Sequence, residues 1–135
     1  MSDFKLPAPD APAEEWGRLA LSIPGCWWMP GMRDAASGWR WDGHSFVEQG
    51  ARHPQAGNCI KGVNEHWPDP DDPATAGCLL ALIHSRGAYM VPCSRHEGWW
   101  RAIIPAGAWP ESAPTLGRAC IAAAAALGRW PGGEG

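Results

Sequence analysis

Apolar positions in the second half of the chain recur at the spacing of an α-helix. One stripe follows the acidic, proline-rich segment 68–72 and predicts a helix over residues 73–86. Asp71 or Asp72 is expected to cap its first backbone N–H groups, and Pro73 suits the first helical turn. The stripe consists of Cys78, Leu79, Leu82, Ile83 and Arg86.

The same periodicity predicts two further helices. One begins at Pro12, with Asp10 as its expected cap, and ends at Pro24. Its apolar face consists of Trp16, Leu19, Ala20 and Ile23. The other opens at residues 112–114 and runs through an alanine-rich segment, whose small side chains let a helix approach a sheet closely. Its apolar stripe consists of Leu116, Ala119 or Cys120, Ala123 and Leu127.

Alternating apolar and polar residues predict short strands between the helices. The expected strands cover residues 39–42, 45–49, 88–93 and 99–104. Hairpins placed between helices are typical of antiparallel folds, in contrast to alternating parallel units. The predicted fold class is therefore α+β: a small antiparallel sheet of about four strands packed with three helices, in the order α-β-β-loop-α-β-β-α.

Proline and glycine set the expected domain organisation. Residues 1–11 are predicted to form an extended arm, because their prolines are incompatible with a helix. Residues 12–128 are expected to form a single α+β domain, and residues 129–135 a flexible tail. Within the domain, residues 50–70 show no periodicity, and an irregular connection of that length in a compact domain is typically functional or mobile. Most of them belong to the loop 43–67, an insertion relative to simpler domains.

The net charge and the Trp, Gly and Pro content limit the classes of protein to which the chain can belong. The chain has 135 residues and a net charge of −3, which removes the electrostatic argument for binding a long nucleic acid. It contains 10 Trp, 17 Gly and 14 Pro, and this tryptophan content separates it from disordered chains of similar glycine and proline content. We therefore expect a folded domain with many turns and ordered loops.

The number and spacing of the five cysteines indicate the cellular compartment of the protein. They are odd in number and include no C-x-x-C pair, which indicates reduced thiols. The N-terminus lacks the apolar core of a secretion signal, and the apolar run 119–127 is too short to cross a bilayer. The expected location is the cytoplasm of the host cell.

Four short segments together resemble a known family. They are the segment Asp71–Ala76, the strand residues Trp99–Ala102, the helix start Ala113–Ala122 and the upstream Trp28–Met32. In these segments the chain resembles small uncharacterised bacteriophage proteins of the phage ABA sandwich domain family. The resemblance implies a phage origin and αβα layering, and it implies no catalytic residues.

Tryptophan and arginine adjoin one another in the predicted strands and the loop. Exposed indoles stack on nucleobases or form protein contacts, and a neighbouring guanidinium can bind a phosphate through two N–H groups. We therefore predict a ligand-binding surface in this region. Its candidate residues are Trp28, Arg33, Trp39, Arg40, Trp41, His66, Trp67, Trp99 and Arg101. The structural alternative is that the indoles pack over the sheet and the arginines cover them by cation–π contact.

Metal and catalytic chemistry have weaker support in the sequence. The candidate metal ligands are Cys93 with His96, or His53, Cys59 and His66. Zinc sites normally show two close ligand pairs, and a second pair is missing. Asp69, Asp71 and Asp72 are interpreted as caps and solvated loop residues, and a glycine-rich phosphate loop is absent. We expect neither a metal nor a cofactor.

These observations favour a non-enzymatic binding protein encoded by a bacteriophage. The specific hypothesis is a counter-defence protein that sequesters a nucleotide second messenger through Trp and Arg contacts, argued from family-level analogy. The alternatives are a protein–protein inhibitor or virion accessory factor, and a Cys/His hydrolase. The expected partner is a small nucleotide or a host defence protein, without a long nucleic acid or a membrane. A homo-oligomer is expected, because an open sheet edge and surplus indoles need covering.

Overall fold

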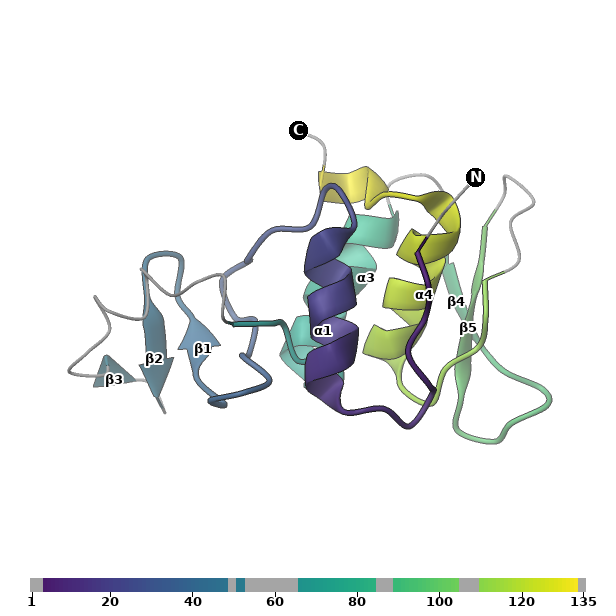
Figure 1. Ribbon diagram of the computed structural model, residues 1–135, viewed down its shortest axis with the longest axis horizontal. Helices are drawn as coiled ribbons and strands as arrows, with labels where there is room; N and C mark the ends of the chain where they lie inside the picture. Colours follow the sequence, from purple (N-terminus) through teal and green to yellow (C-terminus); the bar gives the residue numbers. More distant parts are fainter. Residues whose placement is uncertain (1–3, 49–50, 53–65, 85–88, 105–109, 134–135) are drawn as a thin grey trace.

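A computed structural model describes residues 4–48, 51–52, 66–84, 89–104 and 110–133 of the chain (Figure 1). The elements are α1 (Ala13–Ser22), β1 (Arg40–Trp41), β2 (Phe46–Glu48), β3 (Ala51–Arg52), α3 (Pro73–His84), β4 (Tyr89–Pro92), β5 (Trp100–Ile103), α4 (Leu116–Leu127) and the 3₁₀ turn η2 (Pro131–Gly133). The α+β class is confirmed. The element order roughly matches the prediction, with β3 as an additional strand in the segment predicted to be a loop. No helix in these ranges is long and apolar enough to cross a membrane.

The strands form two sheets, so the prediction of one sheet is wrong. β1, β2 and β3 make an antiparallel meander, and β4 pairs with β5 in a separate hairpin. The two sheets lie at opposite ends of the molecule with the helices between them (Figure 1). On the edge of β5 that faces away from β4, Ala113 exchanges two backbone hydrogen bonds with Trp100.

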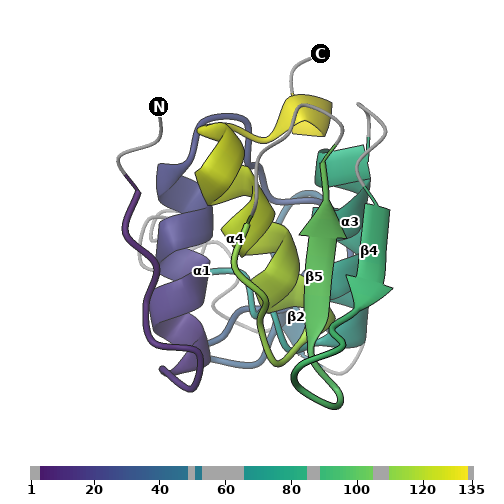
Figure 2. The same ribbon diagram turned by 90° about the vertical axis from the view of Figure 1, so that its right-hand side faces the viewer.

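Helix α4 is the centre of the core. It contacts α1, α3 and β5, and Figure 2 shows it between these elements. Its residues from Gly117 to Ala125 are all buried, and their small side chains permit this close packing. At Gly117 a Cβ atom would overlap the carbonyl group of Pro70, so the acidic loop before α3 lies directly on this helix. The predicted close approach of the alanine-rich helix to a sheet is confirmed.

Three helix starts differ in how well the sequence predicted them. Asp72 caps α3, because its carboxylate accepts the backbone N–H of Thr75 at 3.0 Å. The expected cap of α1 by Asp10 is wrong: Pro12 occupies the N-cap position and supplies no side-chain hydrogen bond. Helix α4 is capped by Thr115, which accepts the Arg118 N–H, and it begins after the predicted opening at residues 112–114.

Trp130 departs from the expectation of a flexible tail. Its side chain is fully buried, and its indole Nε1 donates to the carbonyl oxygen of Ala20 at 3.0 Å. Its backbone N–H donates to Pro24 at 2.8 Å, next to the α1 terminus. The residue closes the core between α1 and η2, so the ordered domain extends past residue 128. The proline and glycines that follow Trp130 are typical of an irregular tail, so the sequence did not predict that this residue is buried.

The cysteines agree with the expectation of reduced thiols. Cys26, Cys78, Cys93 and Cys120 are free, and Cys59 lies outside the described residues. Burial raises the pKa of both the Cys26 and the Cys120 thiol to about 12. Those two side chains therefore act as small core residues.

Candidate binding site

The acidic loop 68–72 is joined by three ion pairs to two distant parts of the chain, the segment 33–40 and helix α4. Asp69 pairs with Arg33. Asp71 receives Arg118 Nε and Nη2 at 2.9 and 2.8 Å, and Asp72 receives both Nη atoms of Arg40 at 2.7 Å. The predicted role of these acids as caps is confirmed for Asp72. Their ion pairs were missed, because each partner is at least 32 residues away in sequence.

The contacts of Asp71 and Asp72 favour the charged form of these two carboxylates. Hydrogen bonds from Arg40 and from Thr75 outweigh burial and lower the pKa of Asp72 to about 2. Burial alone would raise the pKa of Asp71, but hydrogen bonds from Arg118 and Thr115 bring it below its ordinary value. The loop is therefore a fixed, neutralised junction and presents little free negative charge.

Seven of the nine predicted ligand residues lie in or beside the meander lobe, which we define as residues 26–48, 51–52 and 66–67. An aromatic cluster forms its centre. Trp28 and Trp41 each meet the Phe46 ring with centroids 5.0 Å apart, and His66 lies 4.5 Å from that ring. The seven residues are Trp28, Arg33, Trp39, Arg40, Trp41, His66 and Trp67.

The polar members of this set already have partners. Arg33 and Arg40 are bound by carboxylates, although their side chains stay 40% and 45% exposed. His66 Nδ1 lies 2.8 Å from a carboxylate oxygen of Asp34, a fully buried residue. Trp67 packs beneath the guanidinium of Arg18, 4.7 Å from the ring centroid. The structural alternative therefore accounts for much of the predicted surface.

Trp99 and Arg101 lie apart from the other seven. They belong to the β4–β5 hairpin at the far end of the molecule (Figure 1). The Trp99 ring stacks on His96 with centroids 4.3 Å apart, at the hairpin turn. The nine predicted residues do not converge on one site.

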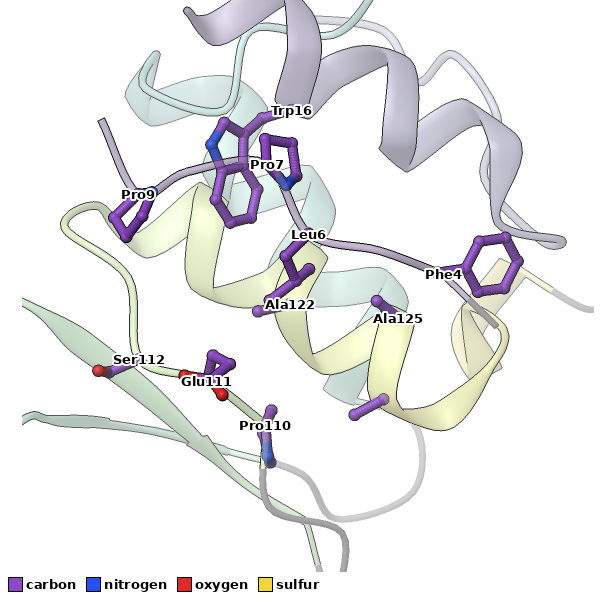
Figure 3. Close-up of a pocket in the computed structure, with 11 residues that line it drawn as sticks. Phe4, Leu6, Pro7, Pro9, Trp16, Pro110, Glu111, Ser112, Ala122 and Ala125 are labelled. Carbon is purple, nitrogen blue, oxygen red and sulfur yellow. The ribbon is translucent and has the colours of Figure 1, made fainter. Parts of the chain in front are cut away.

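A cavity of about 500 Å³ lies beneath the N-terminal arm, on the side away from the meander lobe. Figure 3 shows Leu6 and Pro7 of the arm on one side, Trp16 of α1 above, and Ala122 and Ala125 of α4 as the floor. The remaining lining residues are Phe4, Pro9, Pro110, Glu111, Ser112 and Ala126. Most of the lining is apolar, and among the described residues that form it Glu111 is the one that carries a charge.

The sequence holds a weak signal for this cavity. Prolines at positions 7 and 9 keep the arm extended and prevent it from forming a helix. The alanines of α4 have side chains too short to fill the space under the arm. The combination leaves a hollow, but its position depends on contacts between residues about 100 positions apart in sequence.

The described residues contain no group of three or more His, Cys, Asp or Glu side chains able to hold a metal ion. Among the candidate ligands, His53 and Cys59 lie outside the described ranges. Cys93 lies at the hairpin turn, where backbone N–H groups of Arg95 and His96 and the Ser112 side chain lower the pKa of its thiol. That thiol is partly exposed.

Comparison with known proteins identifies no relative: no family model, no curated protein and no solved structure matches the chain. The resemblance to the phage ABA sandwich domain family therefore stays a prediction. The cavity and the meander lobe are therefore the two candidate ligand sites of the protein.

Proposed function

We propose that the protein is a non-enzymatic binding protein whose ligand site is the cavity beneath the N-terminal arm. The observation that carries the proposal is a largely apolar hollow of about 500 Å³ whose described lining residues include one charged side chain, Glu111. Small-molecule sites are concave, mostly apolar and supplied with a few polar groups that orient the ligand. A hollow of this volume holds a small organic molecule.

The lining indicates the chemistry of the ligand. The rings of Phe4 and Trp16 and the alanines of α4 suit an apolar or aromatic body. The Glu111 carboxylate favours a positively charged group. The preferred ligand is therefore an apolar molecule that carries an ammonium group.

The first test uses N-phenyl-1-naphthylamine, a neutral apolar probe whose emission rises in an apolar site. We expect saturable binding to the wild-type protein. Ala126→Phe places a ring at the exposed edge of the cavity and is expected to reduce the affinity at least tenfold. The matched control is Ala74→Phe, at an exposed position of α3 remote from the cavity, which should bind as the wild type does. Equal binding by both variants would refute the proposed site.

A competition experiment tests the ligand class. Benzylammonium and benzyl alcohol have similar size and differ in charge. We expect benzylammonium to displace the probe roughly two- to fivefold more effectively, in line with the strength of partly exposed ion pairs. Glu111→Gln should remove this preference and leave binding of the neutral probe unchanged. An undiminished preference in that variant would contradict the role given to Glu111.

Sequestration of a nucleotide messenger is the second candidate. The supporting observation is the gathering of Trp28, Trp39 and Trp41 with Arg33 and Arg40 in one lobe, with both guanidinium groups still partly exposed. A nucleotide phosphate would share these arginines with Asp69 and Asp72 or displace those carboxylates. The lobe therefore supports this function less strongly than the cavity supports apolar binding.

Thermal-shift measurements separate the two candidates. Cyclic oligonucleotides and ADP-ribose derivatives should raise the melting temperature if the meander lobe binds nucleotides. Trp39→Ala should remove that shift, whereas Ala126→Phe should not. The phage origin, the counter-defence role and the capture of a host protein remain proposals attached to this second candidate.

A further inference from the structure

The N-terminal arm is attached to the helices at one end by a buried arginine and a tryptophan. Arg118 of α4 is 7% exposed, and its Nη1 donates to the carbonyl oxygens of Pro9 and Ala11 at 2.8 and 2.6 Å. The indole Nε1 of Trp16 holds the carbonyl oxygen of Ala8 at 3.0 Å. These bonds secure the segment 8–11, where the arm turns into α1.

Asp71 fixes the direction in which Arg118 points. Its two oxygens receive Nε and Nη2 of the guanidinium, so Nη1 is left facing the arm. Because a guanidinium is planar and rigid, this bidentate pairing sets the position of the third nitrogen. Asp71 is itself held by the Thr115 hydroxyl at 2.8 Å, at the cap of α4. The acidic loop, α4 and the arm therefore form one latch.

The outer part of the arm lies between two hollows. The proposed ligand cavity is on the α4 side, and a second hollow of about 460 Å³ lies on the α1 side, lined in part by Lys5, Leu6 and Arg18. Phe4 and Leu6 are only partly buried where they pack against the core. This part of the arm has free space on both sides, while the segment 8–11 is fixed.

We propose that the arm is a strap that gates the cavity, with residues 8–11 as its anchored end and the Asp71–Arg118 pair as its latch. The inference rests on the proposed function for the ligand site, and it concerns entry to that site. Lateral movement of Phe4 and Leu6 opens the cavity, and breaking the latch releases the whole arm. Displacement of the strap widens the entrance, so an apolar ligand enters faster while the strap is displaced.

Trypsin measures release of the arm without any ligand. Cleavage after Lys5 requires several residues of the arm to leave the surface, and cleavage after Arg18 requires α1 to unfold. We expect Asp71→Asn and Arg118→Gln to raise the rate of cleavage after Lys5 on the order of tenfold, because each removes charge-assisted hydrogen bonds. The Arg18 site serves as an internal control for global unfolding.

Arg40→Gln is the matched control, because it breaks the neighbouring ion pair to Asp72 and does not touch the arm. It should leave the ratio of cleavage after Lys5 to cleavage after Arg18 unchanged. The strap is refuted if Asp71→Asn also leaves this ratio unchanged. Where Arg118→Gln unfolds the protein, Asp71→Asn alone decides, since the Asp71 side chain is 36% exposed.

Stopped-flow association of N-phenyl-1-naphthylamine measures the gate itself. We expect the association rate to rise on the order of tenfold in Asp71→Asn, in parallel with arm release. A raised cleavage rate with an unchanged association rate would refute the gate while leaving the ligand site intact. Absence of probe binding in the wild type would refute both the ligand site and its gating. Cleavage after Lys5 would still test the latch alone.

Discussion

At the scale of single residues, Asp72 combines three contacts that stabilise the start of α3. Its carboxylate accepts the backbone N–H and the hydroxyl of Thr75, each at 3.0 Å, and it pairs with Arg40. The cap was predictable, because the signal is local: an acid followed by a proline before an apolar helix. The ion pair with Arg40 was not predictable. Arg40 lies 32 residues before Asp72, and no local sequence pattern shows that the fold brings the two side chains together.

Asp72→Ala should lower the free energy of unfolding by about 2–3 kcal/mol, through loss of the cap and of a partly exposed ion pair. Asp10→Ala is the control, because α1 has no side-chain cap, and its effect should stay within about 0.5 kcal/mol. Urea unfolding followed by circular dichroism gives both values. Equal losses in the two variants would contradict the assigned role of Asp72.

The same carboxylate predicts a pH dependence. The pKa of Asp72 is lowered in the folded protein to about 2, from an ordinary value of 3.8. A lowered pKa means that the stabilising contribution is complete above pH 4 and is lost as the pH falls toward 2. The difference in unfolding free energy between wild type and Asp72→Ala should therefore shrink over that interval. A difference that stays constant from pH 6 to pH 2 would contradict this linkage.

At the scale of elements, helix periodicity was a reliable guide and sheet pairing was not. The stripes that predicted α1, α3 and α4 repeat within a few residues, so one element's sequence contains the whole signal. Pairing between hairpins depends on what covers each strand edge. Ala113 pairs with Trp100 on the edge of β5 that faces away from β4. The alternation of apolar and polar residues within β5 gives no sign of this contact with a residue outside the strand.

Two helical glycines provide a matched test of element packing. At Gly117 of α4 a Cβ would overlap the backbone of Pro70, whereas at Gly77 of α3 it would meet no atom within 4 Å. Gly117→Ala is therefore expected to destabilise the fold by roughly 1–3 kcal/mol through overpacking. Gly77→Ala should stabilise it by about 1 kcal/mol through helix propensity. Thermal unfolding of both variants decides, and a stabilising Gly117→Ala would refute the close approach of the loop to α4.

At the scale of the whole molecule, the acidic loop links the meander lobe to the helical core. Arg33 contributes its backbone N–H to Thr75 at 2.8 Å and its carbonyl oxygen to Asp69 N at 2.8 Å, in addition to its ion pair. Most of the candidate Trp and Arg residues predicted from the sequence lie in the meander lobe. The arm cavity and the buried position of Trp130 were not predicted from the sequence. Both depend on contacts between residues far apart in the chain, namely the arm with α4 and Trp130 with α1.

This linkage predicts that the lobe can loosen while the helices remain folded. In the double variant Arg33→Gln/Arg40→Gln, two ion pairs between lobe and loop are lost, while Arg118 keeps the loop on α4. Near-ultraviolet circular dichroism reports the packed indoles of the lobe, and the far-ultraviolet signal reports the helices. In urea the near-ultraviolet midpoint should fall below the far-ultraviolet midpoint.

The wild type should give coincident midpoints, as a cooperative domain does. Arg95→Gln, at an exposed position of the β4–β5 hairpin, is the control and should also keep them together. Coincident midpoints in the double variant would mean that backbone contacts alone couple the lobe to the core. Because the arm cavity borders α1 and α4 and not the lobe, probe binding should survive in the double variant while any nucleotide binding by the lobe is lost. That contrast assigns each candidate ligand to its own end of the molecule.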